Sequence, residues 1–155
     1  MAFKGFAFVL AVVALSAGTA QAAPSAWAQA QIKDMDTGGF GAPVEALTFE
    51  GAVARGQEGS VSVTLPESGD WALVGSCGED CADIGLILDR KDGTNAGEGV
   101  SGFKASLPAG TYDLHIGFDR CKEPQCRYVV RAYRKPLPPN VRRTTFRSST
   151  NMPIS

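Results

Sequence analysis

Apolar and polar residues alternate in short runs over residues 44–135, and turn residues separate one run from the next. The clearest run is TYDLHIGF (residues 111–118), whose aromatic and aliphatic side chains share one parity while more polar residues take the other. SVSVTL (residues 60–65) places two valines and a leucine on one side and serines and a threonine on the other. Side chains of a strand point alternately to its two faces, so this period of two predicts strands with one buried face.

Further runs with the same character begin near residues 46, 71, 83, 100 and 127, and in DIGLILD the residues Ile84, Leu86 and Leu88 share one face. Segments with glycine or proline separate the runs. The longest is RKDGTNAGEG (residues 90–99), which predicts a long polar loop that turns at Asp92-Gly93. No long helical period follows residue 22. The pattern therefore predicts an all-β antiparallel sandwich of about seven or eight strands.

The first 22 residues have the features of a secretory signal peptide. Lys4 supplies a positive charge, an apolar core follows, and Ala20-Gln21-Ala22 forms a small-x-small cleavage site. We therefore expect a bacterial protein that is periplasmic or secreted, with no transmembrane segment after signal removal. The predicted organisation is a signal peptide (1–22), a loosely ordered leader with a short helix over Trp27–Ile32 (23–43), the sandwich (44–135), and a disordered basic tail rich in proline, serine and threonine (136–155).

Charge is distributed unevenly along the expected mature chain. Residues 23–123 carry 7 Lys/Arg and 16 Asp/Glu, a net of −9, whereas residues 124–155 carry 7 Lys/Arg and no acid. The basic end predicts an interaction surface for an anionic envelope polymer, a lipid head group or an acidic protein. Nucleic acid is not an expected partner, because the protein is predicted to be exported. The alternatives are a basic end that pairs with the protein's own acidic body, and an edge strand protected by cations. The candidate partner-binding residues are Arg127, Arg131, Lys135, Arg142, Arg143 and Arg147.

Four cysteines form two close pairs, spaced C-x3-C and C-x4-C, in loops beside predicted strands. In an oxidising compartment such cysteines are first expected to form disulfides. Zinc sites favour C-x2-C spacing or histidines, and the acids that flank the first pair oppose a reactive thiolate. We predict the local bridges Cys77–Cys81 and Cys121–Cys126, with bridges between the two loops as the alternative.

Carboxylates gather around and after the first cysteine pair. Asp80, Asp83 and Asp89 are candidate calcium ligands, because Ca²⁺ takes six to eight oxygens, and the alternative is a solvated acidic rim. His115, the only histidine, lies on the polar side of its predicted strand, and no nucleophile motif accompanies it. We assign no catalytic residue and no required cofactor. A hydrolase that uses the acidic loop carboxylates is the low-ranked alternative.

The central stretch resembles the bacterial pre-peptidase C-terminal domain and its small exported relatives, over roughly residues 44–135. DIGLILDRKDG (residues 83–93) resembles a D-x-D-L-x-L strand that ends in a D-G turn, and PAGTYDLHIG (residues 108–117) resembles a turn leading into G-x-Y-x-L-x-V. The resemblance implies a jelly-roll-like β-sandwich with a non-catalytic accessory role. Some relatives bind calcium near the acidic motif. Here only Asp83 matches that motif, because Gly85 stands in place of the second acid.

Together these features predict an exported, non-catalytic β-sandwich protein with a binding role or a structural role in the cell envelope. A small exported inhibitor, or an accessory subunit of a secreted or envelope enzyme, is the alternative.

Overall fold

A computed structural model describes residues 23–135, so the expected signal peptide and basic tail lie outside the described residues. The described chain forms one helix and eight strands. Their bounds are α1 (Ala26–Asp34), β1 (Pro43–Ala54), β2 (Gly59–Leu65), β3 (Gly69–Ser76), β4 (Asp83–Arg90), β5 (Asn95–Val100), β6 (Gly102–Leu107), β7 (Gly110–Asp119) and β8 (Gln125–Arg134).

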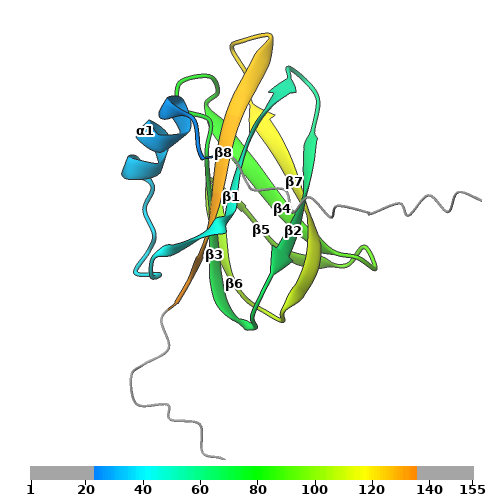
Figure 1. The fold of residues 1–155 in the computed structure, drawn as a ribbon. Coiled ribbons are helices and arrows are strands. Elements are labelled where there is room, and N and C mark those ends of the chain that lie inside the picture. The colour runs from blue at the N-terminus through cyan, green and yellow to red at the C-terminus, as the bar shows by residue number, and fades with distance from the viewer. Residues whose placement is uncertain (1–22, 136–155) are drawn as a thin grey trace, which may run out of the picture.

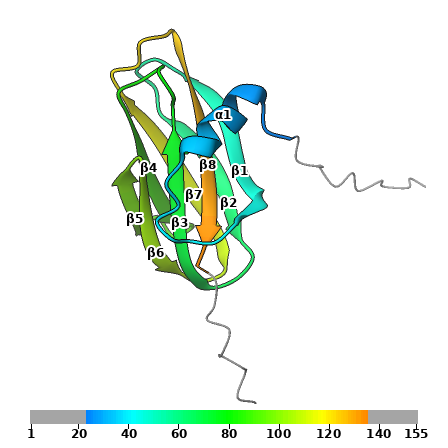
Figure 2. The same cartoon turned by 90° about the vertical axis from the view of Figure 1, so that its left-hand side faces the viewer.

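The strands form two antiparallel sheets of four, which face each other as two layers (Figures 1 and 2). Sheet A has the order β1-β8-β3-β6, and sheet B has the order β2-β7-β4-β5. The predicted all-β antiparallel sandwich is confirmed, and this strand order is that of a jelly roll. The core lies between the sheets and is built mainly from the apolar side chains of the strands, except β5, which contributes no buried residue. Ile84, Leu86 and Leu88 of β4 are all buried there, as their alternation predicts.

The segment over residues 90–99 differs from the predicted long loop. The turn is shorter, because the Arg90 N–H donates to the Thr94 carbonyl oxygen and the Asp92 carboxylate accepts the Thr94 N–H. The rest of the segment is the edge strand β5, which pairs with β4. Its glycines allow close packing on β6, since a Cβ on Gly97 would lie 2.5 Å from the ring of Phe103. A strand built from glycine and polar residues gives no alternating signal, so the sequence pattern missed it.

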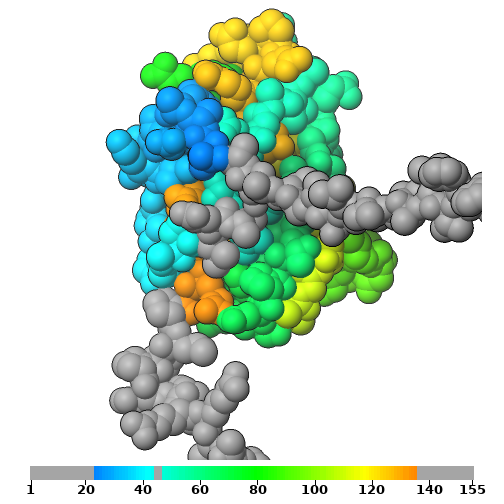
Figure 3. Space-filling view, in the orientation of Figure 1, coloured from blue at the N-terminus to red at the C-terminus, as the bar shows by residue number. Residues whose placement is uncertain are grey.

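The leader also differs from the loosely ordered segment that the sequence predicts. Residues 23–42, here called the strap, include α1, whose N-cap residue Ser25 accepts a hydrogen bond from the Ala28 N–H at 3.1 Å. Ala28 is fully buried where α1 packs against β8. Further along, the Gly41 N–H donates to the carbonyl oxygen of Arg134 at 3.0 Å. The strap therefore lies across the outer face of sheet A, where its blue and cyan atoms cover one side of the molecule (Figure 3).

Candidate functional site

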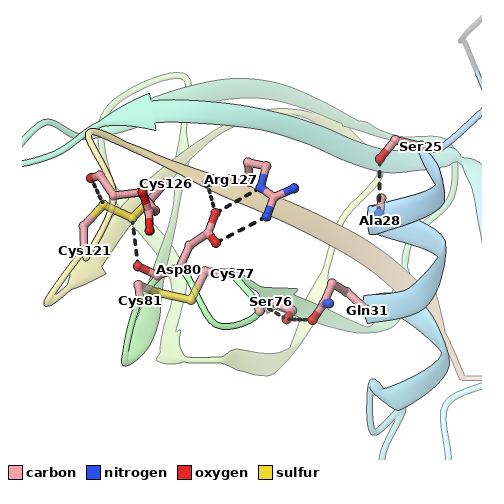
Figure 4. Close-up of polar contacts among 12 residues, drawn as sticks. Ser25, Ala28, Gln31, Ser76, Cys77, Asp80, Cys81, Cys121, Cys126 and Arg127 are labelled. Atoms are coloured by element: carbon pink, nitrogen blue, oxygen red, sulfur yellow. Dashed lines mark hydrogen bonds and ion pairs between the residues drawn. A yellow bond between two sulfur atoms is a disulfide. The ribbon is translucent and has the colours of Figure 1, made fainter.

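The two predicted disulfides are present, and each closes one loop at the same end of the sandwich (Figure 4). Cys77 bonds to Cys81 and Cys121 bonds to Cys126, with Cα–Cα distances of 5.9 and 6.0 Å. The loops are called the first and second cysteine loops below. Both bridges are consistent with a protein that resides in an oxidising or extracellular compartment.

Asp80 joins the two cysteine loops to each other and to β8. Its Oδ2 accepts from Nε of Arg127 at 3.0 Å and from the Arg127 backbone N–H at 3.3 Å, while its Oδ1 accepts from Nη2 at 3.3 Å (Figure 4). Its carbonyl oxygen accepts the Lys122 N–H at 2.8 Å. The side chain of Asp80 is only 12% exposed, and the hydrogen bonds from Arg127 lower its pKa below the usual range. Asp80 is therefore a structural carboxylate.

The candidate calcium site is not formed by the three predicted aspartates. Asp80 is neutralised by Arg127, while Asp83 and Asp89 occupy opposite ends of β4. Six residues of strand separate those two by about 20 Å, well beyond a shared coordination sphere. Among the side chains that the structure describes, those of residues 23–43 and 47–135, no three histidine, cysteine, aspartate or glutamate side chains lie close enough together to hold a metal ion. Gly85 and its neighbours therefore form sheet surface and not a cation cage.

The predicted basic surface on β8 is only partly open, because the strap covers this face. Arg127 is held by Asp80, and its guanidinium also lies 4.6 Å from the ring centroid of Trp27 in α1. The Arg131 guanidinium lies 5.8 Å from the ring centroid of Tyr133, and its Nε is buried with no hydrogen-bond partner among the described residues. Lys135 is exposed at the end of the strand. The candidates Arg142, Arg143 and Arg147 lie outside the described residues.

A second set of contacts fixes the strap at the first cysteine loop. Ser76 Oγ donates to Oε1 of Gln31 at 3.1 Å and accepts the Gly78 N–H (Figure 4). Below α1 a hollow of about 420 Å³ remains between the strap and the β3–β6 edge. The amine of Lys104 in this hollow is used within the fold, since it donates to the Gly38 carbonyl oxygen and lies over the Phe40 ring. These groups hold the strap in place, so the polar groups of this hollow are already used within the fold. It is therefore a weaker candidate for a binding site than the hollow described next.

The outer face of sheet B carries a separate hollow of about 340 Å³, called the sheet B hollow. Gly85 and Gly117 are paired across β4 and β7 and form its floor, because neither has a side chain. Ile87 and Val100 stand beside this floor and are 41% and 68% exposed. Among the described side chains of residues 23–43 and 47–135, they are the exposed large hydrophobic ones. The apolar surface of this face is therefore gathered at one place.

Charged groups surround the sheet B hollow and are mostly acidic. Glu58 and Glu98 line it together with His115. The imidazole of His115 lies between two carboxylates, with Nδ1 3.0 Å from Oε1 of Glu58 and Nε2 3.5 Å from Oδ2 of Asp89. His115 thus lies on the outer polar face, where strand parity places it. The arrangement offers an apolar contact with an acidic border.

The sequence analysis singles out Gly85 and His115 separately, but it does not predict that they lie together in one hollow with Ile87 and Val100. Ile87 breaks the alternation of β4, since it is an apolar residue on the polar parity, and this was the available signal. Val100 belongs to the missed strand β5. The pairing of Gly85 with Gly117 depends on the register of β4 against β7, which local sequence does not reveal.

Comparison with known proteins does not place the chain in a family. No model of a protein family matches it, and no curated protein matches it significantly. In the described part of the chain, α1 is too short and too polar to cross a membrane.

Proposed function

We propose that the protein is exported and acts as a non-catalytic binding module, and that the sheet B hollow is its contact surface. One observation carries this proposal: Ile87 and Val100 are exposed together beside a floor of glycines. Single exposed apolar side chains are ordinary on a protein surface. Two in one hollow with a polar border are typical of a ligand or partner site.

Export is supported by the signal-peptide features of residues 1–22 and by the two disulfides. The resemblance to pre-peptidase C-terminal domains adds an accessory role to this proposal. A non-catalytic role is supported by how the loop carboxylates are used. Asp80 binds Arg127, and Asp92 accepts hydrogen bonds from both the backbone and the hydroxyl of Thr94. These two loop carboxylates therefore stabilise local structure.

An inhibitor or accessory subunit of a secreted enzyme would use the same surface. The sheet B hollow is shallow and lies on a broad sheet face, so it fits a protruding protein segment better than an enclosed small molecule.

Export is tested by fractionating cells that produce the full chain. We expect a processed form in the periplasm or medium, and a form that keeps the first 22 residues when Ala20 and Ala22 are replaced by arginine. An unprocessed cytoplasmic wild-type protein would overturn the export part of the proposal.

The contact surface is tested by filling it. A Cβ at Gly117 meets no atom within 4 Å, so Gly117→Val adds apolar volume to the hollow from a position with open space for its Cβ. Ser62→Val is the matched control, because Ser62 is exposed on the same sheet but does not line the hollow. In affinity capture from the protein's own compartment, we expect a species that wild type and Ser62→Val retain and Gly117→Val loses. Identical captures by all three proteins would contradict the assignment of the hollow.

A further inference from the structure

We propose that the sheet B hollow binds a basic peptide segment with an aromatic side chain, and that its occupant is the chain's own segment VRRTTFR, residues 141–147. This inference rests on the proposed function, because it needs the hollow to be a contact surface. It names both the chemistry of the ligand and the segment that supplies it.

The border of the hollow favours a cationic ligand. Glu58 and Glu98 lie at its edge, and Asp89 adjoins it through His115. The nearby cation Lys91 is already paired with Asp113, so it does not cancel these charges. Each surface pair alone contributes little, but several carboxylates around an apolar floor select against an acidic ligand.

The segment 141–147 supplies the complementary groups. It has three arginines around Phe146 and lies in a stretch, residues 124–155, that contains no acid. The body over residues 23–123 has a net charge of −9. An arginine guanidinium pairs with carboxylates, while an aromatic ring between arginines can cover the glycine floor beside Ile87 and Val100.

The covalent connection is long enough. Lys135 lies at the end of the sandwich where β3 begins, since its N–H donates to the carbonyl oxygen of Asp70. The same end holds the start of β7 at Gly110, because the Ala109 N–H donates to Oγ of Ser68 in the turn before β3. From there the route to Gly117 crosses one sheet spacing of about 10 Å. It then follows seven strand residues over about 23 Å, which makes about 33 Å in all. The eleven residues from 136 to 146 can span about 36 Å.

The order of groups along that route also fits. A chain that rises along β7 from Gly110 meets the level of Asp113 and Asp89 first, because these two residues are paired across β7 and β4. It then reaches Gly117 and Gly85 four residues further along each strand. In the tail the arginines at 142 and 143 likewise precede Phe146 by three or four residues. The arginines therefore lie near Asp89, whose carboxylate is not paired with Lys91, when the ring lies over the glycine floor.

The test is a competition within the mature full chain. A synthetic peptide of residues 139–150 is titrated into wild type and into a chain in which Arg142, Arg143, Phe146 and Arg147 are all replaced by serine. A tethered segment has an effective concentration near millimolar, so the wild-type tail should block the hollow. We expect the peptide to bind the substituted chain at least tenfold more tightly than wild type, and the substituted chain to have a slightly lower thermal midpoint because it lacks the stabilising contact of the tail.

Two further variants of the substituted chain locate the binding. Glu58→Gln with Glu98→Gln removes two border charges and should weaken the peptide at least fivefold at low salt. Glu79→Gln with Glu123→Gln removes the same charge from the exposed cysteine loops and should leave the affinity unchanged.

Equal peptide affinity for wild type and the substituted chain would overturn the tail as occupant. Absence of binding to the substituted chain would overturn the basic peptide as ligand. Neither result removes the proposed function, which fails separately if filling the hollow at Gly117 changes no species captured by the substituted chain, whose tail no longer blocks the hollow.

Discussion

Replacing Asp80 by asparagine tests how the two cysteine loops are held. The carboxylate receives three hydrogen bonds from Arg127, and asparagine keeps its size while removing its charge. Hydrogen bonds to a charged group contribute about 1.5–3 kcal/mol to stability. Arg127 keeps 50% of its side-chain surface exposed and can rehydrate, so we expect the lower part of this range, about 2 kcal/mol. In a domain of this size that corresponds to a fall in Tm of roughly 8–12 °C.

The cost should depend on pH with a defined sign. Hydrogen bonds from Arg127 lower the pKa of Asp80 below its ordinary value of 3.8. A carboxyl group with a lowered pKa in the folded state stabilises the protein above its unfolded pKa and loses this effect as pH falls through the folded pKa. The stability gap between wild type and Asp80→Asn should therefore be complete at pH 6–7 and shrink below about pH 4.

The assay is urea unfolding followed by circular dichroism at pH 7 and at pH 3. Asp83→Asn is the matched control, because Asp83 is exposed three residues away and no ion pair of its side chain is found among the described residues. An equal loss in the two variants, or a gap for Asp80→Asn that is unchanged at pH 3, would refute this reasoning.

Three further predictions concern the backbone, the strap and the first bridge. Gly102→Ala should destabilise the fold far more than Gly110→Ala in thermal unfolding, because both residues have φ near 150° but only at Gly102 would a Cβ meet backbone, 2.6 Å from the Leu73 carbonyl oxygen. Equal losses of stability in the two variants would exclude this contact as the cause. Ala28→Glu should speed tryptic cleavage after Lys33, since Ala28 is the residue of α1 that is buried against β8, whereas Ala30→Glu, at an exposed position, should not; equal rates would mean that α1 is not docked. Replacing both cysteines of the first loop by serine should cost about 2 kcal/mol in urea unfolding, as expected for so short a loop, and no loss would show that the bridge does not restrict the unfolded chain.

The sheets were predictable because their information is local. Each strand that alternates apolar and polar residues, such as β4 and β7, buries the predicted parity, and the close spacing within each cysteine pair indicated its bridge. β5 was missed because an edge strand of glycine and polar residues is stabilised by backbone pairing and by close approach to β6. The short helix predicted over Trp27–Ile32 is present as α1, but the docking of the strap on sheet A was missed, because its single fully buried residue is an alanine, which gives no hydrophobic period.

The candidate site was less predictable, because it depends on contacts between distant segments. In the sequence, Asp80 is one of several acidic residues in a loop. Only the fold brings Arg127, which lies 47 residues later in the chain, within hydrogen-bonding distance of it. The sheet B hollow likewise requires Gly85 and Gly117 to be paired and Val100 to lie beside them. Residue types alone did not distinguish this surface from an ordinary solvated sheet face.

The central claim is that the sheet B hollow contacts a peptide or protein segment, and photo-crosslinking in cells tests it most directly. A photoreactive amino acid at position 100 would extend from an exposed side chain in the hollow, and one at position 62 would lie on the same sheet outside it. We predict a specific adduct from position 100, within the chain or to a partner, that is absent from position 62 and lost when Gly117→Val is added. No adduct from position 100, or the same adducts from both positions, would contradict the account.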